Sequence, residues 1–299
     1  MIVRENNRDS WISDILSESA RLESLEQKMQ YLFGAWPEVS LRIRTAGHVL
    51  LLSDYDGTLA PIVERPELAD LASHTRARLA ALVRLGRYTV GVISGRVLSD
   101  LRQRVGLAGV VYAGNHGLEV EGPGLSFVNP VAEQFRPVFR ILHKVLEKAL
   151  APVKGVLVEN KGLSLSIHYR LVRESQVSEV GRVFERVVGT ARADGMLKTT
   201  SGKKVYEVRP PVSWDKGKAI EVLLRRSRRR FGKKGALALF LGDDLTDEDG
   251  FKVVNKHDGI SVFVGEDASH SVAMYQLRSP AEVDRFLGLL LELERGEGE

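Results

Sequence analysis

The sequence predicts an α/β fold, in which helices flank a parallel β-sheet and an antiparallel unit interrupts the middle of the chain. From about residue 48 onward, short apolar runs alternate with segments whose apolar residues recur at helical spacing, which is the pattern of strand-helix-strand units. The runs are continuous in Val, Ile and Leu, as in strands covered on both faces. Residues 163–169 instead alternate strictly between apolar and polar side chains, which is typical of a strand with one covered face.

The elements of the parallel part follow in order along the chain. The apolar runs predict strands over residues 49–53, 88–94, 110–113, 237–241 and 260–264. Apolar residues at helical spacing predict helices over residues 75–85, 97–105 and 219–229. In such a sheet the carboxyl ends of the strands share one edge, where open α/β sheets bind their ligands.

The middle of the chain predicts a separate α+β unit. Residues 163–169 and 203–208 look like half-covered strands, and residues 177–188 look helical. Gly122-Pro123-Gly124 and Pro210-Pro211 are typical linker sequences at its two ends. We therefore expect a core domain of residues 46–122 and 211–299, with an inserted domain over residues 123–210.

Residues 1–45 form a third region. The apolar positions 12, 15, 16, 22, 25, 29, 32 and 33 approximate one helical face. We expect an accessory helical segment that packs on the core or on a second subunit and carries no chemistry.

Composition limits the class of protein. The 299 residues are 43% apolar and 27% charged, and none is cysteine, so a globular protein is expected and disulfides, thiolate catalysis and zinc-cysteine sites are excluded. No apolar run approaches the roughly 18 residues of a membrane span, so we expect a cytoplasmic enzyme without a membrane partner. Seven basic residues cluster at 225–234. Cations favour the carbonyl end of a helix, and without interleaved aromatic residues we expect no nucleic-acid partner.

Two acids follow the first buried strand. Asp54 and Asp56 stand at its carboxyl end, followed by Gly57 and Thr58. Paired carboxylates tolerate each other when a cation neutralises them, and hard oxygen ligands favour Mg²⁺. Gly57 permits a tight turn whose backbone N–H groups can hold phosphate oxygens. The alternative is a turn rich in Asp and Gly without a function.

Two further strand or helix ends carry residues suited to an anion. Ser94, Gly95 and Arg96 end the second apolar run just before a helix, where a hydroxyl and free amides favour phosphate; a plain helix cap is the alternative. Lys216 lies in the first turn of a helix that Asp215 caps. A lysine there opposes the helix dipole, so it indicates an anionic partner, although Lys218 or a solvated lysine is the competing interpretation.

The last strand end is strongly acidic. Asp243, Asp244 and Asp247 follow the apolar run at 237–241, together with Glu248 and Asp249. Acids packed this densely repel one another unless a cation is bound. An ordinary acidic helix start explains residues 247–249 but does not explain Asp243 and Asp244 at the strand end. A metal site is therefore predicted.

In combination, these motifs resemble the haloacid dehalogenase superfamily of phosphotransferases. Its four motifs match Asp54-x-Asp56-Gly57-Thr58, Ser94, Lys216 and Asp243-Asp244. The resemblance implies a Rossmann-like parallel-sheet core of the haloacid dehalogenase type with an inserted α+β cap domain. Further segments are similar to the trehalose-6-phosphate phosphatases within it, namely residues 54–63, 93–96, 114–117, 158–162, 166–170, 207–210 and 242–248.

The resemblance also implies a role for each residue. Asp54 is the expected nucleophile, Asp56 the general acid and base, and Lys216 a second cation. Mg²⁺ is the implied cofactor, with Asp54, Asp56 through its backbone carbonyl, and Asp243 as ligands, supported by Asp244 and Asp247. The implied phosphate-binding residues are Thr58, Ser94, Gly95 and Lys216. The implied substrate-binding residues are Arg96, Asn115, His116, Glu159, Lys161, Ser166, His168, Lys203, Glu207 and Arg209.

These roles imply a Mg²⁺-dependent phosphatase that hydrolyses trehalose 6-phosphate to trehalose and phosphate through an aspartyl-phosphate on Asp54. Alternatives within the same chemistry are phosphatases for sucrose phosphate, glucosylglycerol phosphate or mannosyl-phosphoglycerate, and a phosphomutase. A catalytically silent regulatory module is the alternative from another class. The expected partner is a small sugar phosphate, and residues 1–45 leave a homo-oligomer or coupling to a trehalose-phosphate synthase open.

Overall fold

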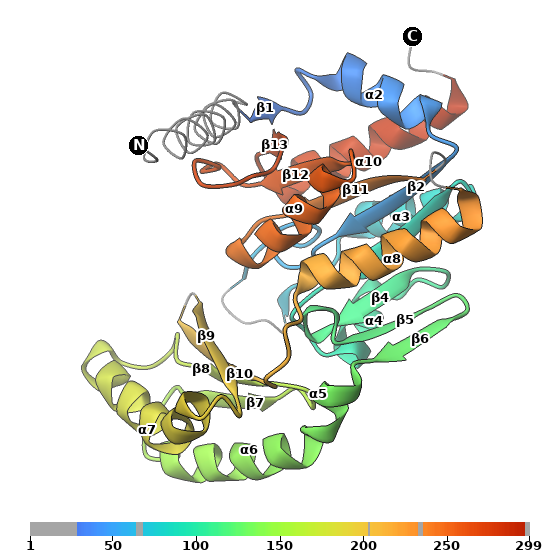
Figure 1. The fold of residues 1–299 in the computed structure, drawn as a ribbon. Helices are drawn as coiled ribbons and strands as arrows, with labels where there is room; N and C mark the ends of the chain where they lie inside the picture. The colour runs from blue at the N-terminus through green and yellow to red at the C-terminus, as the bar shows by residue number, and fades with distance from the viewer. Residues whose placement is uncertain (1–28, 64–67, 203, 233–235, 297–299) are drawn as a thin grey trace, which may run out of the picture.

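The computed structural model describes residues 29–63, 68–202, 204–232 and 236–296. A nine-stranded sheet has the strand order β1-β13-β12-β11-β2-β3-β4-β5-β6, and a separate four-stranded sheet has the order β7-β8-β10-β9. The smaller sheet lies below the larger one in Figure 1. The predicted α/β architecture with an inserted antiparallel unit is confirmed.

The large sheet is parallel except at one edge. Strands β1 to β4 and β11 to β13 pair in parallel, whereas β5 and β6 add an antiparallel hairpin next to β4. The strands are β1 Gln30–Tyr31, β2 His48–Ser53, β3 Tyr88–Ile93, β4 Val111–Gly114, β5 Glu119–Gly122, β6 Leu125–Val128, β11 Ala236–Gly242, β12 Ile260–Val264 and β13 Tyr275–Leu277.

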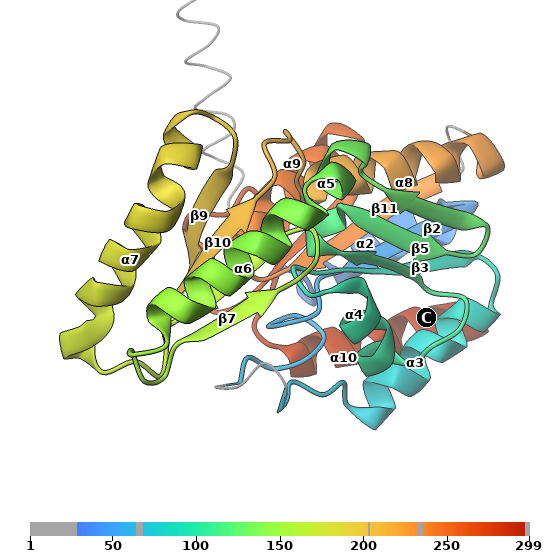
Figure 2. The ribbon, with the colours of Figure 1, turned by 90° about the horizontal axis from the view of Figure 1, so that it is seen from below.

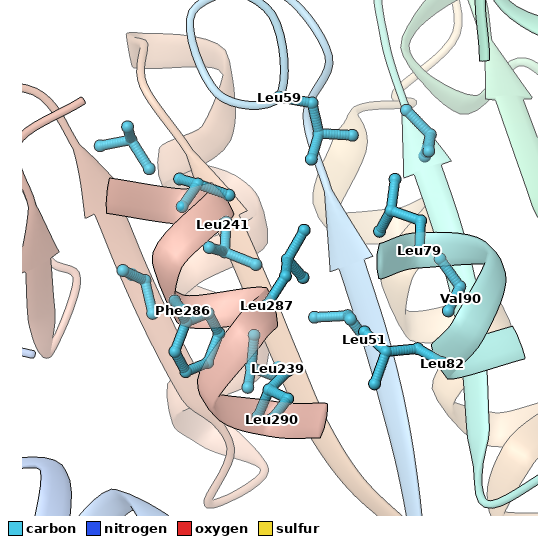
Figure 3. Packing of buried hydrophobic residues seen from close by; sticks show 14 of the residues in the cluster. Leu51, Leu59, Leu79, Leu82, Val90, Leu239, Leu241, Phe286, Leu287 and Leu290 are labelled. Carbon is cyan, nitrogen blue, oxygen red and sulfur yellow. The ribbon is translucent and has the colours of Figure 1, made fainter. Parts of the chain in front are cut away.

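Helices cover both faces of this sheet. Side chains alternate across each strand, so Leu51 packs toward α3 and α10 on one face (Figure 3), while Leu50 and Leu52 pack toward α8 and α9 on the other. Full burial of one such side chain contributes about 1.5–3 kcal/mol. The first face carries α2 Trp36–Thr45, α3 Ser73–Arg84, α4 Leu98–Val105 and α10 Pro280–Arg295, and the second carries α8 Lys216–Phe231 and α9 Glu248–Lys256.

The small sheet has one covered face and one polar face. Ile167 and Val208 pack with Phe184 and the rest of the helical layer, which Figure 2 shows as α6 and α7 along one side of this sheet. On the other face, the strand register places Glu159, Ser166 and Glu207 in one row. The elements are α5 Pro130–Gln134, α6 Arg136–Leu150, β7 Leu157–Asn160, β8 Leu165–His168, α7 Glu174–Ala193, β9 Lys198–Gly202 and β10 Val205–Arg209.

The first junction between the two units differs from the expected position. Gly122-Pro123-Gly124 is the turn of the β5–β6 hairpin, where Gly124 has a φ of 62°, and both strands belong to the large sheet. The structure therefore places this junction after Val128 rather than at residue 122, because backbone pairing with β5 holds β6 in the large sheet. Linker-like composition does not distinguish a hairpin turn from a domain boundary.

The structure corrects part of the predicted N-terminal helical segment. The expected helical face extends to Leu32 and Phe33, but Gln30–Tyr31 forms the edge strand β1, paired in parallel with β13. The segment forms a strand despite its helical periodicity, because its backbone hydrogen-bonds to the open edge of the sheet. The rest of the predicted helical segment, residues 1–28, lies outside the described residues. Within the described ranges, no helix is both long and apolar enough to cross a membrane.

Candidate active site

The centre of the site is a buried lysine between two carboxylates. Asp54 follows β2, Lys216 opens α8, and Asp247 lies in the turn η3 (Leu245–Asp247) after β11. Lys216 Nζ donates to Asp54 Oδ1 at 2.9 Å and to Asp247 Oδ1 at 2.8 Å. All three residues are at most 5% exposed. Lys218 points elsewhere, since its Nζ donates to Ser213 Oγ. The structure thus joins three strand or helix ends that are 31 and 162 residues apart in sequence.

A third carboxylate completes a group suited to a divalent cation. Carboxylate oxygens of Asp54, Asp243 and Asp247 all lie within 4.8 Å of one another. Three such oxygens beside one lysine leave excess negative charge and present the hard donors that Mg²⁺ prefers. Gly57, at φ 84°, makes the approach possible, because a Cβ there would lie 2.1 Å from Asp243 Oδ2. Thr58 Oγ1 donates to Asp243 Oδ1 at 3.3 Å, so it orients this acid.

The shifted pKa values of Asp54, Asp247 and Lys216 also indicate that the three carboxylates have too little positive charge beside them. Burial raises the pKa of Asp54 well above its usual range, and Asp247 and Asp243 raise it further while Lys216 opposes them. Burial likewise raises the pKa of Asp247 to about 6 against the effect of Lys216. For Lys216, burial favours the neutral amine, but Asp247 and Asp54 outweigh it and raise its pKa. An additional cation would therefore favour the ionised carboxylates.

Asp244 lies outside this group. It caps η3, accepting from Thr246 N at 2.8 Å and from Thr246 Oγ1 at 2.6 Å, and its side chain is not among the three converging acids. Asp247 Oδ2 completes the capping box by accepting from Asp243 N at 3.1 Å and Asp244 N at 3.2 Å. Of the two acids expected to support the metal, only Asp247 has its carboxylate in the group.

Asp56 faces a guanidinium instead of the other acids. Arg96 Nε donates to Asp56 Oδ2 at 2.7 Å and Arg96 Nη2 to Oδ1 at 2.6 Å. Arg96 also donates to Asp100 Oδ2 at 2.9 Å and lies over the Tyr55 ring. The bidentate pair fixes the orientation of the Asp56 carboxylate. Its side chain is thus not a member of the converging group.

The loop after β3 brings the phosphate candidates to the same edge. The buried Ser94 hydroxyl accepts from Arg96 N at 3.1 Å. The His116 ring packs so close to residue 95 that only glycine fits there, because a Cβ would lie 2.7 Å from His116 Nε2. The Gly95 carbonyl accepts from Lys161 Nζ at 3.0 Å. A residue of the inserted unit therefore reaches the loop that was expected to bind phosphate.

Glu207 is the centre of the charges on the inserted unit. It lies 3.6 Å from Lys161 Nζ and 3.4 Å from His116 Nε2, and it accepts from Arg209 Nε at 3.0 Å. Burial alone would raise its pKa, but His116, Arg209 and Lys161 lower it well below the usual range. Burial lowers the pKa of His116 itself to about 4, and Glu207 opposes this shift.

Two buried polar groups have unused hydrogen-bonding capacity. Among the described residues, neither ring nitrogen of His116 nor the hydroxyl of Ser166 has a hydrogen-bond partner. Nearby, His168 Nε2 contacts Glu159 Oε2 at 3.0 Å. Buried polar atoms without partners are costly, so these positions fit a ligand that supplies hydroxyl groups. Lys203, the remaining predicted substrate residue, lies outside the described residues.

Asn115 was expected to bind substrate, but its amide contacts protein. Its Nδ2 donates to Glu119 Oε1 at 2.8 Å and to Lys161 O at 3.1 Å, and its Oδ1 accepts from Ser164 Oγ at 2.7 Å. Glu119 and Ser164 were not predicted to belong to the site. Glu119 alternates with Val120 and Glu121 as an ordinary strand residue and gave no signal, whereas Ser164 shares the alternating pattern with Ser166 and could have been included on that ground.

The basic run lies on the outer side of α8. Arg225 pairs with Glu221, and Arg226 donates to the Gly124 carbonyl. With Leu125, Val222 and two further arginines of α8, they line an open hollow of about 600 Å³ that contains none of the catalytic candidates. Arg228 to Arg230 fall in the last turn of α8, as expected for cations at the carbonyl end of a helix.

Comparison with known proteins places this geometry in a family. The model of the trehalose-phosphatase family matches residues 52–281. A trehalose-phosphate phosphatase of Mycobacterium tuberculosis is 36% identical over 290 residues, which cover 95% of this chain and 71% of the relative. The C-terminal domain of the Candida albicans trehalose-6-phosphate phosphatase superposes with a TM-score of 0.72 at 25% identity, over 88% of this chain and 98% of that one.

A more distant structure shows how widely the fold is shared. A haloacid dehalogenase-like hydrolase from Bacteroides thetaiotaomicron superposes with a TM-score of 0.58 at 16% identity, over 81% of this chain and 99% of that one. The fold is therefore that of the haloacid dehalogenase type. From the family match and the extent of the similarity, the chain belongs to the trehalose-phosphatase family of phosphoric monoester hydrolases.

Proposed function

We propose that this protein hydrolyses trehalose 6-phosphate to trehalose and phosphate, with Mg²⁺ as cofactor and Asp54 as a covalent nucleophile. The observation that carries the proposal is the buried Asp54, bonded to Lys216 Nζ at 2.9 Å and grouped with Asp243 and Asp247. A carboxylate that attacks a phosphate dianion needs neighbouring positive charge. This arrangement holds one cation and fits a second.

In the first step, an Asp54 carboxylate oxygen attacks phosphorus, and the bond between phosphorus and the sugar oxygen breaks. Asp56 would donate a proton to the departing oxygen, for which its carboxyl must be protonated and must release one of the two hydrogen bonds from Arg96 that orient it. Lys216 and the Ser94 hydroxyl would contact the phosphate oxygens. The products of this step are trehalose and an aspartyl-phosphate on Asp54.

In the second step, Asp56 removes a proton from water, and the water oxygen attacks the phosphorus of the aspartyl-phosphate. The bond between phosphorus and the Asp54 oxygen then breaks, which releases phosphate and restores the carboxylate. Bound through Asp54, Asp243, the Asp56 carbonyl and, in addition, Asp247, Mg²⁺ would supply charge that stabilises the attacking carboxylate and the phosphate. Lys216 keeps Asp54 and Asp247 from repelling each other.

The inserted unit would act as a cap that selects the sugar. Its polar face presents Glu159, Ser166 and Glu207 in one row, and the unused polar atoms of Ser166 and His116 fit sugar hydroxyl groups. Lys161 links this face to the phosphate loop through Gly95 O. We place the cap at residues 129–210, and we retain association through residues 1–45 as a prediction.

The test of substrate is phosphate release from a panel of sugar phosphates. Trehalose 6-phosphate should be hydrolysed at least about 100-fold more efficiently than glucose 6-phosphate, because its second glucose ring adds contacts with the cap face. Sucrose phosphate, glucosylglycerol phosphate and mannosyl-phosphoglycerate test the alternatives. Equal rates for trehalose 6-phosphate and simple hexose phosphates would overturn the substrate assignment.

The test of the nucleophile is Asp54→Asn. The variant should lose about 1,000-fold or more in turnover on every phosphate ester, with its fold retained because Asp247 still pairs with Lys216. Asp249→Asn, an exposed acid that pairs with Lys252, is the matched control. Near-normal turnover in a folded Asp54→Asn variant would exclude covalent catalysis at this residue.

A further inference from the structure

The turn after β4 adopts a left-handed backbone conformation. Asn115 and His116 have φ values of 48° and 57°, a region in which Asn and His occur more often than most other residues except glycine. Two backbone hydrogen bonds impose this turn, from Asn115 N to Arg96 O at 2.8 Å and from His116 N to Ser94 O at 2.9 Å. The turn is therefore tied to the loop that holds Ser94.

The Asn115 side chain joins this turn to the inserted unit. On the core side, its Nδ2 donates to Glu119, whose carboxylate also accepts from Leu98 N at 3.2 Å. On the cap side, it contacts the Lys161 carbonyl and the Ser164 hydroxyl. The side-chain NH2 group of Asn115 thus donates only to protein atoms, and the residue is 1% exposed. A direct hydrogen bond from this amide to a sugar would require breaking one of these contacts.

The segment that Asn115 contacts is the β7–β8 turn, and this turn carries Lys161. Leu163 at its centre is fully buried against Leu118, beside the part-buried Trp214. Lys161 then extends from the turn to the Gly95 carbonyl at 3.0 Å and to Glu207 at 3.6 Å. The position of the lysine ammonium therefore depends on how the turn is seated on Asn115.

We propose that Asn115 is a positioning residue that locks the β7–β8 turn onto the phosphate loop. It thereby places the Lys161 ammonium where it can bind the sugar. It acts through Lys161 and Ser164 and does not contact the substrate. The inference rests on the proposed function and deepens it, because it gives Asn115 a role in selecting the sugar and no role in the chemistry at phosphorus. Loss of the lock should therefore harm sugar phosphates and spare phosphate esters that lack a sugar.

The kinetic test compares Asn115→Gly, Ser164→Ala and the double variant. Glycine adopts positive φ without strain, so Asn115→Gly removes the amide and not the turn. We expect its KM for trehalose 6-phosphate to rise about 10-fold or more, while kcat/KM for p-nitrophenyl phosphate stays within about twofold of wild type. Ser164→Ala should raise KM by about fivefold, and it should add little in the Asn115→Gly background. Ser178→Ala, exposed on α7, is the control.

Equal losses on both substrates in Asn115→Gly, or fully additive effects in the double variant, would overturn the proposal. A second measurement does not depend on the substrate. Lys161 N donates to Ser164 O and Leu163 N to Lys161 O within the turn, so hydrogen exchange in residues 160–165 should accelerate in Asn115→Gly while β12 is unchanged. Unaltered exchange would also overturn the lock. If wild-type protein does not hydrolyse trehalose 6-phosphate, the substrate assignment fails, and the exchange result still decides on the lock.

Discussion

On the core side of the site, Asp54, Lys216 and Asp247 stand at the ends of regular elements and are almost completely buried. On the cap side, Glu159, His168 and Glu207 stand on one face of a small antiparallel sheet, with side chains that are 40%, 28% and 16% exposed. The core group consists of buried charges, where each partner depends on the others. The cap group is a row of adaptable polar contacts. Chemistry and specificity are therefore expected to respond differently to substitution.

Lys216→Met should produce the largest effect, because it leaves two buried carboxylates without their cation. We expect a loss of about 1,000-fold or more in kcat on every phosphate ester and a loss of about 3–5 kcal/mol in the free energy of unfolding. Added Mg²⁺ should raise the melting temperature of Lys216→Met more than that of wild type, since a metal replaces the missing charge. Lys218→Met, two residues away on α8, is the control, and an equal loss there would contradict the special role of Lys216.

Gly57→Ala tests the metal site from the backbone. A Cβ would lie 2.1 Å from Asp243 Oδ2, so Asp243 must move, and we expect the Mg²⁺ concentration for half-maximal activity to rise about 100-fold. Gly86 also has a positive φ, of 67°, but a Cβ at that position would have no atom within 4 Å, so Gly86→Ala is the control. It controls for backbone strain alone. A similar shift in both variants would show that strain, and not displacement of Asp243, causes the effect.

Glu207→Gln tests whether the cap affects specificity alone. It removes the charge that pairs Arg209 and Lys161, so KM for trehalose 6-phosphate should rise about 10- to 100-fold. Hydrolysis of p-nitrophenyl phosphate should change by less than about threefold, because the core group is intact. Glu174→Gln, an exposed cap residue that pairs with Lys204, is the control. A comparable loss on both substrates would remove the proposed division between core and cap.

His116 lies where core and cap meet. Its replacement should give the smallest effect, which should appear in how the free energy of unfolding depends on pH. Burial lowers its pKa in the folded protein to about 4, from 6.5 in the unfolded chain, so the unfolded state binds more protons between these values. Its contribution to stability is complete above pH 6.5 and is lost as pH falls toward 4. The loss is about 2 kcal/mol after allowance for local relaxation. In His116→Gln, denaturant melts should show a smaller difference between pH 7 and pH 4.5, whereas exposed His270→Gln should match wild type.

The core was predictable because each of its signals is local. A continuous apolar run followed by an acid or a serine predicts a strand end, and a capped lysine predicts a helix start, so Asp54, Ser94 and Lys216 were expected at one edge of the sheet, where Lys216 contacts Asp54. Sequence does not show that Asp244 caps η3 while Asp247, three residues later, turns inward to Lys216. The hairpin turn at Gly124 was mistaken for a boundary for a similar reason. Its glycines indicate a turn without indicating which sheet the next strand joins.

The sequence by itself determined the parallel sheet, the order of its strands along the chain and the acids, hydroxyl and lysine of the core, because periodicity and strand ends are properties of short segments. Only the tertiary structure decided how these ends pair. It placed Asp56 against Arg96, Glu207 between Lys161 and Arg209, and Asn115 under the β7–β8 turn. These contacts join residues far apart in the chain, and their partners are selected by packing and by the need to satisfy buried polar groups, which no local pattern records.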